Sequence, residues 1–271
     1  LIRSEGYWSI EGQQFTSKVR RSVSARRVFL AAGTLATTRF ALKTLAIRSS
    51  IPLLSSPTAA FLLWLPHFLG ASRSPFFGLG QLSFSLAIQE NINGFGTTLS
   101  TAGIPVSEFA QYLPLGRRYA VDVLGNLLSS CLVGNVFLPG NLSTANVVLK
   151  SDGSLQINGG YREDVAQFFE MAAKKLRIAY WKLGAVLLPM SFTIGRSGSD
   201  IHYAGTLPMR LNPNVGETNS MGEVFGLEGV HVIDGACLPS LSEKSHTLTI
   251  MANADRIARQ FVLGKTINNK I

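Results

Sequence analysis

The stretch from residue 229 to residue 262 constrains the fold of this chain more than any other. Val230, Val232 and Ile233 form a short β-branched run between glycines, which favours a buried strand. An Asp-Gly pair follows, and beyond the next loop apolar side chains recur at the helical period. The members of this apolar stripe are Ile250, Met251, Ala254, Ile257, Ala258, Phe261 and Val262. The sequence therefore predicts a strand, a turn and an amphipathic helix in succession.

The expected start of that helix is suited to chemistry. Ser245 or Thr247 can cap the helix, because a hydroxyl accepts a hydrogen bond from an otherwise unpaired backbone N–H. His246 lies between them. A helix N-terminus carries about half a positive charge, which stabilises anions and electron-rich groups. A strand, a helix end and an imidazole at one place indicate a candidate reaction site.

A second strand-turn-helix unit is predicted near the N-terminus. Val28-Phe29-Leu30 is an apolar strand, and the small side chains of Ala31, Ala32 and Gly33 allow close approach of a ligand. A helix is expected to follow through Leu45. Ligands of α/β sheets bind at the carboxyl ends of the strands, so this turn is a candidate binding element.

The middle of the chain predicts a hairpin and a long helix. The hairpin spans about 146–157, with a type I′ turn at Asp152-Gly153. The helix runs from about Arg162 to Gly184, with Gly184 as its C-terminal cap. Its expected buried stripe consists of Val165, Phe168, Phe169, Ala172, Leu176, Tyr180 and Leu183.

Three segments together resemble the glucose-methanol-choline (GMC) family of FAD-dependent oxidoreductases. Residues 229–254 are similar to the C-terminal signature of the family, and residues 25–34 to its strand and turn of the form V-x-L-A-A-G. Residues 199–209 resemble its H-x-x-G-T-x-x-M loop. The resemblance implies an α/β fold, in which a partial Rossmann-like FAD-binding domain accompanies a substrate domain of antiparallel sheet plus helices.

The resemblance also implies the order of these domains. We expect FAD-binding segments at 1–48 and 223–271 and a substrate-binding domain at 49–222. The N-terminal dinucleotide-binding loop, G-x-G-x-x-G, is absent, because the glycine pairs within 76–82 and 94–96 lack the third glycine. In the family this loop lies at the N-terminus, so we expect the sequence to be a fragment.

The chemistry implied by the resemblance is oxidation of an alcohol CH–OH group by hydride transfer to FAD. His202 matches the catalytic histidine of the family and is expected to take the hydroxyl proton, which suits an ordinary pKa of about 6.5. His246 is the second catalytic candidate, as a hydrogen-bonding partner of the hydroxyl. Aligned on the commoner Asn-Pro form of the family, Ser245 takes the Asn position, so which residue points at the substrate stays open. A role of His246 in helix capping alone also stays open.

Flavin contacts are implied by the same match. The Asp-Gly turn would lie near the ribityl chain, and N–H groups at the last helix would face the pyrimidine edge, where reduced flavin is anionic. We expect no metal site, because the four histidines show no ligand spacing. His231 is expected to be a structural residue of its strand. The residues expected to contact FAD are Ala31, Ala32, Gly33, Asp234, Gly235 and Thr247.

Charge and composition bound the partners. The net charge is +9, but the basic cluster at residues 18–27 carries no nucleic-acid motif, so a solvated edge is favoured and no nucleic acid is expected. Prolines interrupt the uncharged run 49–72, which favours packed irregular structure, with membrane-surface contact as the alternative. Cys131 and Cys237 are expected to be reduced and packed.

The expected partners are a small-molecule alcohol and an electron acceptor that the sequence does not identify. The chain shows no signal peptide, which favours a cytoplasmic location over others. The alternative function is a non-catalytic or cofactor-free remnant of such an enzyme.

Overall fold

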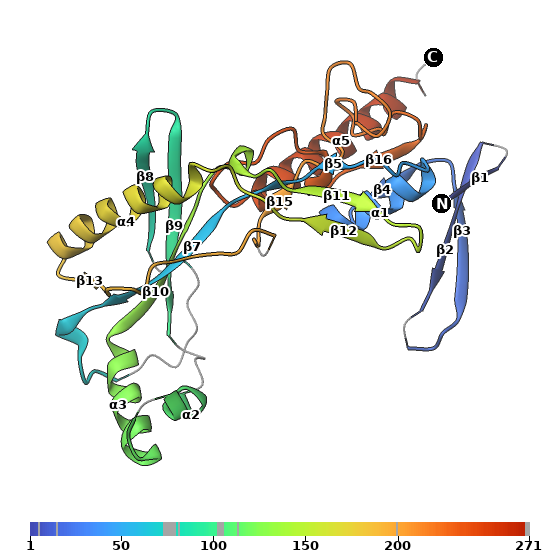
Figure 1. Ribbon diagram of the computed structural model, residues 1–271. Helices are drawn as coiled ribbons and strands as arrows, with labels where there is room; N and C mark the ends of the chain where they lie inside the picture. The colour runs from blue at the N-terminus through green and yellow to red at the C-terminus, as the bar shows by residue number, and fades with distance from the viewer. Residues whose placement is uncertain are drawn as a thin grey trace. The chain divides into compact units, whose positions relative to one another are not determined.

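The computed structural model describes residues 1–4, 6–14, 16–72, 80, 82–101, 106–112, 114–198 and 200–268 (Figure 1). Two compact units make up the chain. Unit 1 consists of Leu1–Ser56, Ser143–Tyr161 and Ile201–Ile271, and unit 2 consists of Pro57–Leu142 and Arg162–Asp200. Of the two glycines within 76–82, Gly78 lies outside the described residues and Gly80 lies within them. Ser199 also lies outside the described residues. Residues 94–96 lie inside a strand.

The geometric division differs from the expected domain boundaries. Residues 49–56, 143–161 and 201–222 belong to unit 1, although the sequence placed them in the substrate-binding segment. Short antiparallel pairs, β5 with β11 and β6 with β15, join these segments to one another. Backbone bonds from Gly205, Leu207 and Met209 to residues 235–237 connect them to the rest of unit 1. The roles of the two units in FAD binding and substrate binding stay predictions.

A parallel pair of strands carries the candidate site in unit 1. Strand β4 (Val28–Leu30) pairs with β16 (Val230–Val232), with Val28 opposite Val230 and Leu30 opposite Val232. These four side chains are buried, as apolar runs of this kind require. Because the strands are parallel, the turns that follow them lie at the same edge. Helix α1 (Thr34–Thr44) follows β4, and the 3-10 helix η4 (Gly235–Cys237) follows β16, as Figure 1 shows for β4, α1 and β16.

Helix α5 (Thr247–Asn268) confirms the last predicted helix but corrects its details. The expected hydroxyl cap is wrong for the described residues, because the Ser245 Oγ atom lies 3.4 Å from Thr247 Oγ1 and neither bonds a helix N–H. The apolar stripe is narrower than expected. Ile257 is buried, but Met251 and Val262, at the edge of the stripe, are exposed, whereas the polar Asn253 is buried.

Short antiparallel sheets complete unit 1. The predicted hairpin is confirmed, but its turn is not type I′: that turn needs a positive φ at both central residues, and only Gly153, at +78°, has one. Strand β11 lies between β12 and β5, and β15 pairs with β6. The strands are β1 (Ile2–Ser4), β2 (Tyr7–Gln13), β3 (Arg20–Ala25), β5 (Ile51–Pro52), β6 (Leu54–Ser55), β11 (Asn146–Leu149), β12 (Leu155–Asn158) and β15 (Tyr203–Ala204).

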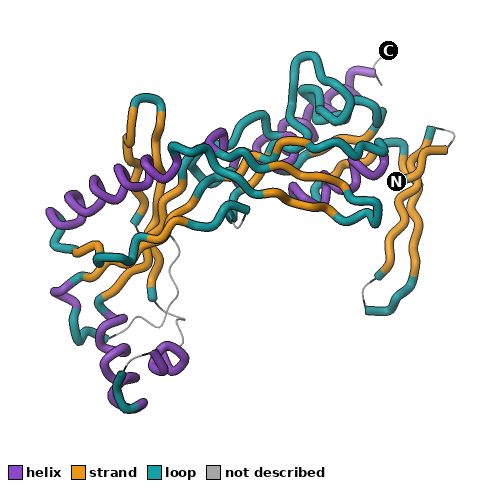
Figure 2. Tube along the Cα trace, viewed as in Figure 1, coloured by secondary structure: helices purple, strands orange, loops and turns teal. Residues whose placement is uncertain are grey.

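Unit 2 is built on a six-stranded antiparallel sheet in the order β13-β7-β10-β9-β8, with β14 also paired to β7. Figure 2 shows β8 and β9 as a long hairpin of this sheet. The strands are β7 (Thr58–Trp64), β8 (Ser83–Gln89), β9 (Ile92–Ser100), β10 (Cys131–Phe137), β13 (Val186–Leu187) and β14 (Thr193–Ile194). The helices are η1 (Pro66–Phe68), α2 (Val106–Phe109), η2 (Ala110–Tyr112), α3 (Arg117–Ser129), η3 (Gly140–Leu142) and α4 (Val165–Lys182).

Helix α4 confirms the predicted long helix of the middle region. Its inner stripe from Val165 to Tyr180 is buried, and the Tyr180 ring lies 6.2 Å from that of Phe61 in β7. Leu183 is exposed instead of buried, because the helix ends before it. Gly184, at φ +75°, ends the helix in the left-handed conformation that glycine adopts without strain. The predicted α/β class, with an antiparallel sheet plus helices, is confirmed.

The uncharged run 49–72 forms β5, β6, β7 and η1, so the expectation of irregular structure is wrong for β7. Within the described ranges, the helices are all too short or too polar to cross a membrane. Cys131 and Cys237 are free and buried, as predicted.

Candidate active site

Asp234 ties together the two turns at the edge of the parallel strand pair. Its Oδ2 atom accepts hydrogen bonds from the Gly33 N–H at 3.0 Å and from the Thr37 hydroxyl at 2.5 Å. Its Oδ1 atom accepts from the Ala236 N–H at 2.9 Å. The side chain is buried, so these bonds form where water does not compete. The structure therefore brings 31–33 and 234–235 together, although they are about 200 positions apart.

Gly235 occupies a position that only glycine fits. A Cβ atom there would lie 2.6 Å from Thr34 Oγ1 and 3.4 Å from Ile250 Cδ1 in the first turn of α5. The Gly235 carbonyl accepts from the Gly205 N–H at 2.9 Å, and the Thr34 hydroxyl donates to the Tyr203 carbonyl at 3.1 Å. Strand β15, α1 and the start of α5 therefore meet around this residue.

His202 and His246 lie side by side at the same place in unit 1. Their ring centroids are 5.3 Å apart, and the ring planes are almost perpendicular, at 86°. His202 immediately precedes β15, and its carbonyl accepts from the Ser56 N–H at 2.9 Å. His246 immediately precedes α5, and its carbonyl accepts the helical bond of the Ile250 N–H at 2.9 Å. Backbone bonds thus anchor the main chain at both histidines.

Both imidazoles are biased toward the neutral form. Burial lowers the pKa of His202, and the neighbouring His246 lowers that pKa further, because two cations so close would repel each other. Burial also lowers the pKa of His246. Nδ1 of His246 is buried and has no hydrogen-bond partner among the described residues. A neutral imidazole can accept a proton on a ring nitrogen that an incoming group can reach.

The turn at Ala31, Ala32 and Gly33 has room for a cofactor. All three residues are exposed, and α1 begins at Gly33 without a side-chain cap. The Gly33 φ angle is +88°, and no heavy atom lies within 4 Å of the position of an added Cβ atom. Small side chains before an uncapped helix N-terminus suit the close approach of an electron-rich group, so the residues present fit the expected FAD.

Two predicted site residues have surroundings that the sequence did not show. The carboxylate of Asp234 is fully used inside the protein, so it holds the two turns together and does not lie free for the ribityl chain. The hydroxyl of Thr247 lies on the exposed start of α5, 3.4 Å from the Ser245 hydroxyl. Contacts of all these residues with FAD stay predictions.

His231 lies outside the site. Its ring is 3% exposed, its Nδ1 atom lies 3.1 Å from the Met221 carbonyl oxygen, and it stacks on Phe29 with a centroid distance of 5.2 Å. Its predicted structural role is confirmed.

Sequence reasoning missed a cluster of buried threonines under the site. Thr34, Thr37 and Thr38 lie on one face of α1, and the Thr38 hydroxyl is 2.5 Å from the Thr206 hydroxyl. Thr37 also accepts from the Ala32 N–H at 3.2 Å. The signal was their spacing of three and four residues, which places polar groups on the helix face toward the core. These hydroxyls connect α1 to Asp234 and to the His202 loop.

Comparisons with known proteins place these residues in a wider context. Residues 162–254, which include both histidines and Asp234, match the C-terminal family model described as GMC oxidoreductase. A search of the curated proteins finds no match to the chain. Among solved structures, the chain is similar to pyridoxine 4-oxidase from Mesorbium loti, with a TM-score of 0.62 and 14% sequence identity. The similarity covers 96% of this chain and 55% of that one, so this chain spans about half the length of the oxidase. At that identity the likeness shows the fold alone.

Proposed function

We propose that this chain, whose residues 162–254 match the C-terminal model of the GMC oxidoreductases, belongs to an FAD-dependent enzyme that oxidises an alcohol CH–OH group with His202 as the base. The observation that carries the proposal is the pairing of His202 and His246 at 5.3 Å. The two residues are far apart in sequence. Their meeting near the turns at Gly33 and Gly235 puts a base and a hydrogen-bonding partner beside the exposed residues 31–33 of unit 1.

His202 takes the hydroxyl proton of the alcohol. Its lowered pKa keeps the ring neutral near pH 7, so that a lone pair is available. Because the Nδ1 atom of His202 is buried, we assign the transfer to Nε2. A general base of this kind contributes about 10²–10⁴-fold to the rate. FAD, when bound, would accept the hydride from the carbinol carbon.

His246 orients the alcohol for this transfer. Because its Nδ1 atom is buried, as that of His202 is, we assign this contact to Nε2. A hydrogen bond between Nε2 and the substrate hydroxyl would hold the proton near His202, which is a positioning effect.

The backbone at Ala31, Ala32, Gly33 and Gly235, together with Thr247, would hold FAD. Asp234 would not contact FAD itself, since its three hydrogen bonds are used to keep the two turns at a fixed separation. We therefore assign Asp234 a positioning role in cofactor binding.

In the experiment, alcohols are added to the full-length protein in the absence of oxygen. Reduction of the flavin is measured as the loss of its visible absorbance. A first panel includes pyridoxine, the compound in the name of the structural relative, and simple primary and secondary alcohols. We expect FAD to copurify with the protein and at least one alcohol to bleach it. Bound FAD that no CH–OH compound reduces would contradict the proposal and favour the non-catalytic alternative.

A further inference from the structure

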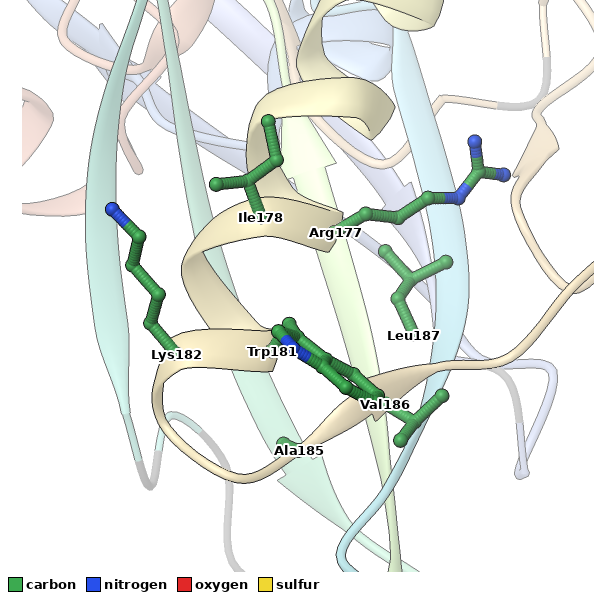
Figure 3. A pocket seen from close by; sticks show the side chains of 7 residues that line it. All are labelled: Arg177, Ile178, Trp181, Lys182, Ala185, Val186 and Leu187. Atoms are coloured by element: carbon green, nitrogen blue, oxygen red, sulfur yellow. The ribbon is translucent and has the colours of Figure 1, made fainter.

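A second surface, in unit 2, combines apolar side chains with positive charge. The end of α4 and strand β13 enclose a shallow cavity of about 380 Å³. Figure 3 shows Trp181 beside Val186, with Arg177 and Lys182 extending to opposite sides of the helix. We call this surface the α4-β13 patch. Its lining residues are Arg177, Ile178, Trp181, Lys182, Ala185, Val186 and Leu187.

The apolar side chains of the patch are unusually exposed. Trp181 is 71% exposed, Ile178 is 61% exposed, and the neighbouring Leu183 is 73% exposed. Single exposed apolar residues are normal on a protein surface, but a group of large ones around a cavity marks an interaction site. The apolar surface is one requirement for docking.

A second element extends the apolar surface. An added Cβ atom at Gly184 would lie 3.9 Å from the His67 ring, so η1 lies next to the end of α4. Phe68 and Leu69, at the end of η1, are 54% and 57% exposed. The pairing of Val186 with Trp64 fixes this arrangement, because it holds β13 against the strand that leads into η1. Two loops of unit 2 thus present large apolar side chains.

The charge around the patch is mainly positive, although the exposed Glu170 lines a neighbouring hollow with Lys174 and Arg177. Between residues 171 and 198 the sequence has five lysines and arginines and no aspartate or glutamate. The run 49–89, which contains η1, also has no acidic residue. Lys174, Arg177 and Lys182 are exposed, and the structure gives them no ion pair to a described residue. Their charge is therefore available to an anionic partner.

We propose that the α4-β13 patch docks on the surface of an anionic membrane. A tryptophan flanked by long cationic side chains suits the interface of a bilayer, where the ring enters the headgroup region and the charges meet lipid phosphates. The core of a protein interface, in contrast, is depleted of charge, whereas this patch carries cations on both sides of its apolar centre. The excess of positive charge selects anionic lipid. This proposal is independent of the oxidoreductase function.

The experiment is sedimentation of the full chain with vesicles. The vesicles contain phosphatidylcholine with about one-third phosphatidylserine, and pure phosphatidylcholine is the comparison. We expect binding to the mixed vesicles alone, and weaker binding at high salt. The Lys174→Gln/Lys182→Gln variant should bind about 30-fold more weakly, since each cation near such a surface contributes about a fivefold factor. The matched control, Lys150→Gln/Lys244→Gln, removes the same charge from exposed positions of unit 1 and should bind nearly as the unchanged chain does.

Fluorescence tests the apolar part of the contact. Trp8 is buried and Trp64 partly buried, so a blue shift on adding vesicles is expected to come from Trp181 and to vanish in Trp181→Phe. Equal binding to both vesicle types, or equal loss in the two lysine variants, would overturn the proposal. Absence of vesicle binding would also overturn it. If the chain then self-associates without lipid, and Ile178→Ser abolishes this self-association, the patch is a contact between copies of the chain.

Discussion

The substitution Asp234→Asn tests the connection between the two halves of the site. It keeps the size of the side chain but leaves one oxygen for three donors. If the amide nitrogen replaces Oδ1 it faces the Ala236 N–H, and if it replaces Oδ2 it faces the Gly33 N–H. Either way two donors oppose each other in a buried place. A hydrogen bond to a charged group contributes about 1.5–3 kcal/mol and an unsatisfied buried donor costs about 1–3 kcal/mol, so we expect a loss of about 2–4 kcal/mol in the free energy of unfolding.

Urea denaturation followed by circular dichroism measures this loss, as the shift in midpoint at a constant slope. The matched control is Asp255→Asn, whose exposed i,i+4 pair with Arg259 contributes about 0.5 kcal/mol or less. Thr37→Val is then measured in the unchanged chain and in the Asp234→Asn variant. The effects of the two substitutions on the free energy of unfolding should differ from additivity by about 0.5–3 kcal/mol, because the two side chains share a hydrogen bond. An Asp234→Asn loss no larger than that of the control would refute the assigned role of this carboxylate.

Four further predictions concern the packing and protonation of the site. Gly235→Ala places a methyl group 2.6 Å from a threonine oxygen and should cost about 1–3 kcal/mol in thermal unfolding, whereas Gly12→Ala, with open space around it, should cost much less. Burial raises the pKa of Cys237 to about 12, so iodoacetamide at pH 8 should label it only after unfolding; labelling of the native chain would contradict this. In NMR titrations His246→Ala should raise the pKa of His202, because the repulsive neighbour is gone. Since the folded-state pKa values of His202 and His246 are lowered, their contribution to stability is complete above about pH 6.5 and falls as the pH drops below it; the opposite trend at this pair would refute the burial of the rings.

Local patterns in the sequence predicted the elements of the site well. The apolar runs at β4 and β16 and the long helices α4 and α5 follow from period and glycine position, and the family resemblance brought His202 and His246 into one hypothesis. Details that depend on tertiary packing were missed. Met251 was assigned to the stripe of α5 by period but is 63% exposed, whereas the polar Asn253 is buried in contact with Cys237.

The division of the chain could not be predicted either, because it rests on non-local pairing. Strands β5, β6 and β15 have two residues each and give almost no periodic signal. Their pairing joins residues 51–55 to residues 146–147 and 203–204, and all of these segments belong to unit 1. The role of Asp234 is non-local for the same reason, since two of its three donors lie about 200 residues away in sequence.

The rate of alcohol-dependent flavin reduction in the full-length His202→Ala protein tests the central claim most directly. His67→Ala, which removes an exposed histidine in unit 2, is the matched control. The account predicts a fall of about 10²–10⁴-fold for His202→Ala, with FAD still bound, and an unchanged rate for the control. A His202→Ala protein that retains its FAD and is reduced as fast as the unchanged enzyme would contradict the assignment of His202 as the base.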